Sequence, residues 1–228
     1  MNKPELVIFD VDGTLLNTEF LWQKAWEETG RRHGVEGFGD QIFRKVVGIS
    51  GKAVENVLEK ELPERADRLE ILNEARITGK KLLEKEVDVM PGTREILAYL
   101  SAMDVNMAVA TTTSREMTEE RLKKLALWDY FKLVLCGDEV KKRKPDPEIY
   151  LSVLKKMNCR CDQCLVIEDT GYGVQSAYSA GIPVIMVPSV NQPNEVQLRQ
   201  AVMVKKNLLE VKKVVEETLE NDKSYGTD

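Results

Sequence analysis

Residues 6–14 read Leu-Val-Ile-Phe-Asp-Val-Asp-Gly-Thr, and they give the strongest indication of the fold. Its first four residues form a continuous apolar run, which has the length of a strand and is typical of one buried on both faces of a sheet. Two carboxylates, Asp10 and Asp12, follow at the point where the run ends. The stretch therefore predicts a central strand with acidic side chains at its carboxyl end.

Similar apolar runs recur in the second half of the chain. We expect strands at residues 105–110, 132–136, 165–167 and 182–187, with residues 201–204 as a sixth at the edge of the sheet. Helical patterns separate most of these runs, and one of them opens with Thr113 and Glu116 at the spacing of a capping box. Alternating strands and helices predict an α/β fold, a Rossmann-like parallel sheet core covered by helices on both faces.

One interval is too long for a simple crossover. The first strand ends near Asp10 and the second begins near Val105, about 95 positions later, whereas a crossover in a compact domain usually needs far fewer residues. Apolar residues recur at helical spacing in this interval, and the interval contains no convincing strand pattern. We therefore expect an inserted all-α cap domain, a helical bundle, at residues 17–86, and a Rossmann-like catalytic core made of residues 1–16 and 87–228.

Composition limits the partners of the chain. The 228 residues are 43% hydrophobic and 31% charged, with a net charge of −5, which is typical of a soluble globular protein without a general attraction to nucleic acid or anionic membranes. No apolar run approaches the ~20 residues needed to cross a bilayer, and no signal-peptide pattern is present. We expect a cytoplasmic protein with no nucleic-acid or membrane partner; the sequence does not indicate its oligomeric state.

Three of the four cysteines, Cys159, Cys161 and Cys164, form a C-x-C-x-x-C cluster before the fourth expected strand. Such a cluster can hold a metal ion or take part in redox chemistry, but it can also be a loop whose thiols stay reduced. A closed structural zinc site needs four ligands, and no fourth ligand is evident near this cluster. The sequence therefore favours the reduced loop, and leaves the role of the three thiols open.

Polar side chains follow the expected strands at their carboxyl ends, where open parallel sheets bind ligands. They are Asp10 and Asp12, Thr111 and Thr112, Lys144, and Glu168 with Asp169. Several carboxylates gathered at one edge repel each other unless a cation joins them, and Mg²⁺ prefers oxygen ligands of this kind. Lys144 suits a phosphate, as does the helix N-terminus that follows Thr111. The pattern predicts a magnesium ion and a phosphoryl group held side by side.

These motifs resemble those of the haloacid dehalogenase (HAD) superfamily. Residues 9–14, Phe-Asp-Val-Asp-Gly-Thr, are similar to its first motif, Thr111 to its second, Lys144 before Pro145 to its third, and Glu168-Asp169 to its fourth. The agreement in order and spacing extends over the whole core. The helical insertion resembles the cap of the subgroup that includes phosphoglycolate phosphatase and beta-phosphoglucomutase.

The resemblance implies a role for each matched residue. Asp10 would be the nucleophile that forms an aspartyl-phosphate, and Asp12 the general acid and base. Thr111, with Thr112 beside it, and Lys144 would hold the phosphoryl oxygens. Mg²⁺ would be bound by the Asp10 carboxylate, the Asp12 backbone carbonyl and Asp169, with Glu168 assisting. The implied function is a magnesium-dependent phosphatase that hydrolyses a small phosphorylated metabolite such as a sugar phosphate.

Other activities of the same superfamily fit less well. Dehalogenases lack the second aspartate of the first motif, which this chain keeps as Asp12. Phosphonate hydrolysis would need a cap lysine as a Schiff base, for which only Lys24 and Lys52 are candidates by position. A sugar-phosphate mutase resembling beta-phosphoglucomutase is the closer alternative, but its arginine after the cap serine is replaced by Gly51 and its cap histidine by Trp22. Glu19, Trp22 and Lys52 are the expected substrate contacts.

Two alternatives come from other classes of protein. A receiver-type phospho-acceptor domain also combines carboxylates, a hydroxyl, a lysine and Mg²⁺, but its acceptor follows the third strand and it has no large insertion. A dinucleotide-binding module is suggested by Gly171-Tyr172-Gly173 after a strand. A single G-x-G that occurs late in the chain is weak evidence for such a module.

Overall fold

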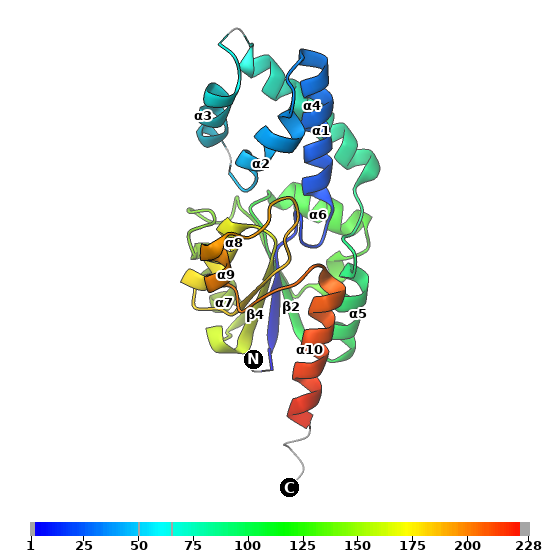
Figure 1. Ribbon diagram of the computed structural model, residues 1–228. Coiled ribbons are helices and arrows are strands. Elements are labelled where there is room, and N and C mark those ends of the chain that lie inside the picture. The colour runs from blue at the N-terminus through cyan, green and yellow to red at the C-terminus, as the bar shows by residue number, and fades with distance from the viewer. Residues whose placement is uncertain (1–2, 50, 65, 224–228) are drawn as a thin grey trace. The chain divides into compact units, whose positions relative to one another are not determined.

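The computed structural model describes residues 3–49, 51–64 and 66–223 (Figure 1). The chain forms two compact units. The sheet unit contains the residues up to Leu16, Val89–Pro188 and the residues from Gln192 onward; the helical unit contains Asn17–Asp88 and Ser189–Asn191. That the helical unit acts as a separate cap domain, as expected for residues 17–86, stays a prediction.

A six-stranded parallel sheet in the order β3-β2-β1-β4-β5-β6 forms the centre of the sheet unit. The strands are β1 (Leu6–Phe9), β2 (Asn106–Ala110), β3 (Leu133–Leu135), β4 (Cys164–Glu168), β5 (Val184–Met186) and β6 (Met203–Val204). The predicted α/β fold with a parallel sheet is confirmed. The continuous apolar run of β1 is explained by its position, because β1 pairs with β2 on one side and β4 on the other and is fully buried.

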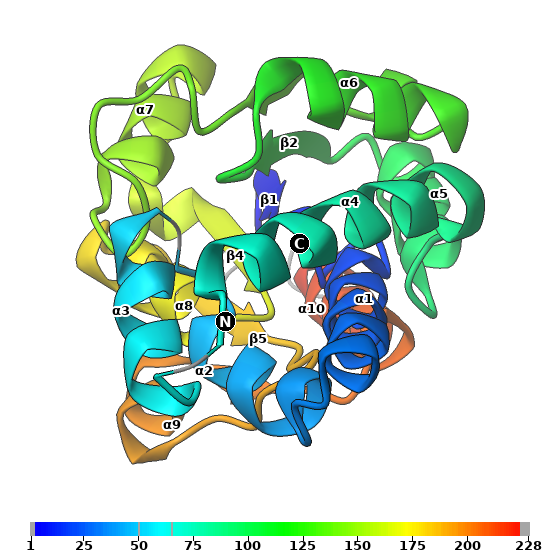
Figure 2. The ribbon, with the colours of Figure 1, turned by 90° about the horizontal axis from the view of Figure 1, so that it is seen from above.

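Helices cover both faces of this sheet, as predicted. They are α5 (Thr93–Ala102), α6 (Arg115–Lys124), α7 (Glu148–Met157), α8 (Gly171–Ser179), α9 (Glu195–Gln200) and α10 (Leu208–Lys223). Figure 2 shows α7 and α8 on one side of the sheet and α5 and α10 on the other. Side chains alternate between the two faces along a strand, so Leu6 and Ile8 of β1 belong to the apolar cluster that packs under α7 and α8. This packing holds the carboxyl ends of the strands at one edge.

The helical unit contains α1 (Thr18–His33), a π-helical turn (Phe38–Ile42), α2 (Phe43–Val46), α3 (Lys52–Glu61) and α4 (Arg68–Glu86). Its apolar core is centred on Trp26, whose ring stacks on Phe38 with centroids 4.6 Å apart and lies 5.4 Å from Phe43. Ion pairs join α1 and α4 at two places, Lys24 with Glu86 at 2.8 Å and Arg32 with Glu74 at 2.5 Å. The unit is therefore held by its own core and by pairing between its two long helices.

Residues 189–191, which come late in the chain, belong to the helical unit. Val190 is buried in that unit's apolar core, and the Asn191 side-chain amide donates a hydrogen bond to the Arg44 carbonyl oxygen at 2.8 Å. The helical unit is therefore completed by a segment that no local pattern assigned to it.

None of the described helices is both long enough and apolar enough to span a membrane.

Candidate active site

A tight turn directly after β1 positions the first two acidic residues. The Asp10 amide continues the strand ladder by donating to the Ile167 carbonyl oxygen at 3.0 Å. The chain then reverses through Gly13, whose φ of 86° favours glycine, and the amides of Leu15 and Leu16 both donate to the Val11 carbonyl oxygen. The turn therefore keeps the two carboxylates at the carboxyl edge of the sheet.

Three buried carboxylates meet at this edge. Among the described residues, oxygens of Asp10, Glu168 and Asp169 lie within 4.8 Å of one another, and Asp12 is not part of that group. Asp10 is 6% exposed, and Glu168 and Asp169 are exposed even less. All potential ligands are carboxylate oxygens, which is the donor set that Mg²⁺ prefers. The residues present therefore fit a hard divalent cation.

Lys144 lies among these carboxylates. Its ammonium Nζ is 2.7 Å from Asp10 Oδ1, 2.6 Å from Glu168 Oε1 and 2.8 Å from the Ala110 carbonyl oxygen. Burial lowers the pKa of Lys144, but the charges of Asp10 and Glu168 outweigh that effect and hold the pKa well above its ordinary value. The group is therefore a permanent positive charge at the end of β1.

The site is still short of positive charge. Burial raises the pKa of Asp10 to about 8, because the opposing Lys144 charge does not offset burial together with the charges of Glu168 and Asp12. The three carboxylates outnumber the single Lys144 ammonium that lies among them, so negative charge is in excess at this edge. An additional cation at this edge would favour the ionised form of Asp10.

Asp12 has a separate set of partners. Its Oδ2 accepts hydrogen bonds from the hydroxyls of Thr113 at 2.6 Å and Thr111 at 3.4 Å, and its Oδ1 is 3.0 Å from Nη1 of Arg121. The Arg121 side chain is only 9% exposed.

The expected capping box is wrong, because α6 starts at Arg115 with Ser114 as N-cap and the Thr113 hydroxyl binds Asp12. Among the predicted phosphate-binding residues, Thr111 is buried whereas Thr112 is exposed.

Glu168 is held by side-chain and backbone partners. Its Oε1 accepts from the Tyr150 hydroxyl at 3.0 Å, and its Oε2 accepts from the backbone amides of Asp169 and Thr170 at 3.0 and 3.2 Å. Tyr150 is fully buried on α7, and the Lys144 ammonium lies 5.1 Å from its ring centroid. The Thr14 hydroxyl is 3.5 Å from Asp169 Oδ1. Thr14 belongs to the first motif but was given no role, and Thr113 was expected to cap a helix. Arg121 and Tyr150 were not predicted, since nothing in their local sequence distinguishes them from helix-surface or core residues.

The structure explains Gly171 and Gly173 without a dinucleotide. A Cβ at Gly173 would lie 1.8 Å from Glu168 Oε1, so only glycine leaves room for this carboxylate under the start of α8. A Cβ at Gly171 would instead meet the side-chain amide of Gln197, at 1.7 Å. Packing against these two side chains therefore accounts for both glycines, and the requirement is strict at Gly173, where the Glu168 carboxylate is held in place.

Replacing Gly173 by alanine is expected to displace the Glu168 carboxylate and weaken the magnesium binding that is predicted for this edge. Overpacking of this kind costs about 1–3 kcal/mol of stability, because the carboxylate is already held by Lys144, Tyr150 and two amides. We expect the thermal unfolding temperature to fall and the half-saturating concentration of Mg²⁺ to rise at least threefold.

Gly171→Ala provides the matched control for Gly173→Ala. Both changes add the same methyl group to the first turn of α8 and gain the same helix propensity, but the Gln197 side chain is flexible and can move away. The Mg²⁺ requirement of Gly171→Ala should match that of the unaltered protein. Equal Mg²⁺ requirements of the two variants would contradict the role of Gly173.

The three predicted substrate contacts belong to the helical unit. The Trp22 ring packs against α4 and stands where a Cβ on Gly79 would lie, so it contributes to the unit's own core. Glu19 lies in the first turn of α1, and Lys52 is exposed at the start of α3. Their assignment as substrate contacts stays a prediction, and Ser50, which precedes the unmatched Gly51, lies outside the described residues.

A Schiff-base role for the cap lysines has no support in their surroundings. The hydrogen bond to Glu86 raises the pKa of Lys24, whereas a lysine nucleophile needs a lowered pKa. Lys52 is exposed to solvent, whereas a Schiff-base lysine is activated in a desolvated pocket or beside another cationic group. The phosphonate-hydrolysis alternative therefore has no candidate residue here.

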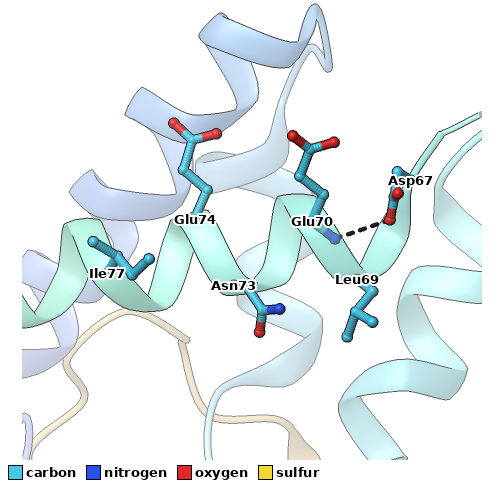
Figure 3. A pocket seen from close by; sticks show the side chains of 6 residues that line it. All are labelled: Asp67, Leu69, Glu70, Asn73, Glu74 and Ile77. Carbon is cyan, nitrogen blue, oxygen red and sulfur yellow. Dashed lines mark hydrogen bonds between the residues drawn. The ribbon is translucent and has the colours of Figure 1, made fainter.

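Figure 3 shows a shallow hollow of about 540 Å³ along α4, elsewhere in the helical unit. It is lined by Asp67, Leu69, Glu70, Asn73, Glu74 and Ile77. Asp67 is the N-cap of α4 and accepts from the Glu70 amide at 2.9 Å. Three of these six residues are acidic and none is basic, so the hollow does not suit a phosphate.

Comparison with known proteins identifies the chain's relatives. A family model for haloacid dehalogenase-like hydrolases matches residues 7–187, a range that contains every residue of the site described above. The chain belongs to this family. The predicted resemblance is confirmed, and with it the expectation of an enzyme of the hydrolase class. The receiver-type and dinucleotide-binding alternatives have no support.

Individual relatives of this HAD-like chain match it over most of its length. A phosphorylated carbohydrates phosphatase of Thermotoga maritima is 36% identical over 186 residues, which cover 78% of this chain and 82% of the relative. A T. maritima structure provisionally named beta-phosphoglucomutase shows 30% identity and a TM-score of 0.74, covering 95% of this chain and 99% of its own. A variant of CbbY from Rhodobacter sphaeroides, solved with xylulose-(1,5)bisphosphate, shows 25% identity and a TM-score of 0.71, with coverage of 91% and 96%. Several relatives of the present chain are named as phosphatases, which confirms the prediction of a phosphatase-type hydrolase.

Proposed function

We propose that this chain is a magnesium-dependent phosphatase that hydrolyses a small phosphorylated carbohydrate through an aspartyl-phosphate on Asp10. The observation that carries the proposal is the junction at the end of β1. There the Lys144 ammonium contacts both Asp10 and Glu168, and Asp169 completes a group of three buried carboxylates. A nucleophile, a fixed positive charge and a set of cation ligands therefore meet at one edge of the sheet.

Asp10 is the proposed nucleophile. A carboxylate Oδ of Asp10 attacks the phosphorus, the bond from phosphorus to the carbohydrate oxygen breaks, and a covalent aspartyl-phosphate forms. Splitting the displacement in two in this way makes each step easier than direct attack by water. Lys144 and Thr111 hold the phosphoryl oxygens, so that much of the catalysis is alignment and charge stabilisation.

Asp12 is the proposed general acid and base. It gives a proton to the departing carbohydrate oxygen in the first step and takes a proton from water in the second. A positioned acid–base group of this kind contributes about 10²–10⁴-fold. Its carboxylate lies outside the group of three, which supports a role in proton transfer apart from metal binding. Arg121 and Thr113 orient it.

Mg²⁺ would be held by the Asp10 carboxylate, the Asp12 backbone carbonyl and Asp169, with Glu168 assisting. When bound, it supplies positive charge that offsets repulsion between the phosphoryl group and the carboxylates. The donor set of buried oxygens and the raised pKa of Asp10 support this assignment. The cytoplasmic location and the lack of nucleic-acid and membrane partners stay predictions.

The substrate class comes from the relatives. One is named for phosphorylated carbohydrates and another was solved with a sugar bisphosphate. A sugar-phosphate mutase is the second candidate, because a neighbouring structure carries that provisional name. A mutase would return the phosphoryl group to another hydroxyl of the sugar, whereas a phosphatase transfers it to water.

Removal of the divalent cation tests the proposal. We expect phosphate release from a panel of sugar phosphates to fall at least a hundredfold in EDTA and to return fully with Mg²⁺, but not with Na⁺ at equal ionic strength. Phosphate is measured colorimetrically under initial-rate conditions. Undiminished release in EDTA would overturn the metal assignment.

The same panel separates the two candidate functions when it includes beta-glucose 1-phosphate. A phosphatase releases inorganic phosphate and free glucose. A mutase forms glucose 6-phosphate with little phosphate release, which coupled oxidation by glucose 6-phosphate dehydrogenase detects. Isomerisation faster than hydrolysis would replace the phosphatase proposal with the mutase.

A further inference from the structure

The C-x-C-x-x-C motif has no part in the proposed function. Cys164 is the first residue of β4, so it lies at the end of the strand opposite to Glu168. Among the described residues, the groups that could hold a metal ion include none of Cys159, Cys161 and Cys164. The structure therefore does not gather these three thiols into a metal site.

Two of the three thiols are paired. The Sγ atoms of Cys159 and Cys164 are 3.3 Å apart, and all four cysteines are reduced. Since a disulfide is about 2.05 Å long, the two sulfurs need to approach by only about 1.3 Å to bond. Cys161 lies elsewhere in the loop, where its Sγ would be 3.8 Å from a Cβ on Gly181.

The backbone on both sides fixes this pair. Asn158 ends α7 in the left-handed conformation, and the Cys159 amide donates to the Leu154 carbonyl oxygen at 3.1 Å. Cys164 is in register with Leu6 of β1, and its thiol can also donate to the Arg160 carbonyl oxygen at 3.2 Å. Both cysteines are therefore held by the ends of regular elements, so the contact does not depend on a loose loop.

We propose that Cys159 and Cys164 form a modification site that undergoes thiol–disulfide exchange with small-molecule disulfides. In the first step the Cys159 thiolate attacks the reagent R–S–S–R, a mixed disulfide Cys159–S–S–R forms, and one R–S⁻ leaves. In the second step the Cys164 thiolate attacks Cys159 Sγ, the protein disulfide forms, and the second R–S⁻ leaves. Two electrons pass from the cysteine pair to the reagent, and the two thiol protons end on the two released thiols.

The order of the steps follows from exposure. Cys159 is partly exposed, whereas Cys164 is 3% exposed, so the reagent reaches Cys159 first. Burial holds the pKa of Cys164 well above its ordinary value, which makes its thiolate scarce and slows the second step at neutral pH. The mixed disulfide should therefore build up near pH 7 and convert faster to the protein disulfide as the pH rises.

The test treats the folded, full-length protein with oxidised glutathione, alkylates the remaining thiols and maps the peptides by mass spectrometry. We expect one Cys159–Cys164 disulfide to form, no disulfide to join Cys161 to either residue, and dithiothreitol to restore all four thiols. A disulfide that includes Cys161, or four free thiols after a treatment that oxidises the denatured protein, would overturn the proposal.

Three variants sharpen the test. Cys161→Ser is the matched control and should form the same disulfide at a rate within twofold of the unaltered protein. Cys164→Ser should stop at the mixed disulfide on residue 159, and Cys159→Ser should form neither product. Because peptide mapping of the unaltered protein decides the pairing by itself, the test does not depend on a variant folding. Loss of the disulfide in Cys161→Ser would refute the assignment of the pair.

Discussion

Asn in place of Asp10 is expected to lower phosphatase turnover by roughly 10⁴-fold or more, because an amide oxygen is a poor nucleophile and cannot form a stable acyl-phosphate. The expected effect is the largest for any single change to this chain. The substitution keeps the size of the side chain, and its oxygen can still accept the hydrogen bond from Lys144 that Asp10 accepts at 2.7 Å. Initial-rate phosphate release on the best sugar phosphate of the panel measures the effect.

The fold should tolerate Asp10→Asn. The change removes one of three buried carboxylates whose oxygens lie within 4.8 Å of one another, and it leaves Lys144 paired with Glu168. We expect the thermal unfolding temperature without Mg²⁺ to stay the same or to rise, since repulsion with Glu168 is relieved. The loss of turnover can therefore be assigned to chemistry once the variant is shown to unfold normally.

Direct detection of the intermediate makes this prediction sharper. Substrate labelled in its phosphoryl group, mixed with enzyme and quenched in acid, should leave label on the protein at position 10. The Asp10→Asn protein should carry none. Residual turnover within tenfold of the unaltered enzyme, or label that persists on the variant, would exclude Asp10 as nucleophile.

Asp12→Asn is expected to lower turnover by about 10²–10⁴-fold, which is the range that a positioned general acid and base contributes. The half-saturating concentration of Mg²⁺ should change less than threefold. The reason is that only the backbone carbonyl of residue 12 is assigned to the metal, and its carboxylate lies with Thr113 and Arg121. Initial rates across a Mg²⁺ titration measure both quantities.

The leaving group distinguishes proton transfer from a merely structural role of Asp12. An aryl phosphate such as p-nitrophenyl phosphate needs little protonation of its leaving oxygen, so the first step should survive in Asp12→Asn while hydrolysis of the aspartyl-phosphate is slow. We expect a burst of about one equivalent of p-nitrophenol followed by slow turnover. Equal losses on sugar and aryl phosphates, with no burst, would contradict the acid–base role.

Asp138→Asn serves as a matched control for Asp12→Asn. Asp138 also sits in a loop at the carboxyl end of a strand, but its oxygens accept from the Arg115 amide at 3.0 and 3.2 Å at the start of α6. Loss of that charge should cost at most about 1 kcal/mol of stability and leave turnover within twofold. A large loss of turnover in the control would show that the edge of the sheet is sensitive to any change of charge.

The apolar runs and the polar residues that follow them were enough to predict the sheet and the edge that carries the candidate site. Residues 6–9 are apolar without interruption because β1 is buried between two strands. A buried strand can therefore be recognised from a few consecutive residues. Polar residues that end parallel strands share an edge whatever the details of packing, which is why Asp10, Thr111, Glu168 and Asp169 could be named together before the structure was known. Their catalytic roles stay proposals.

Which of these groups are in contact depends on packing between distant parts of the chain, and local sequence does not reveal it. Lys144 contacts Asp10, which is 134 positions away, and Arg121 contacts Asp12 across 109 positions. In the sequence, Tyr150 is indistinguishable from any core residue of an amphipathic helix, and only the packing of α7 against the sheet brings its hydroxyl to Glu168. Gly173 resembles part of a nucleotide-binding motif, but the structure shows that the Glu168 carboxylate occupies the space beside it. The position of a residue relative to its strand predicts the edge of the sheet at which its side chain lies. The partner it meets there depends on how helices pack across the sheet, and that packing is set by contacts between residues far apart in the chain.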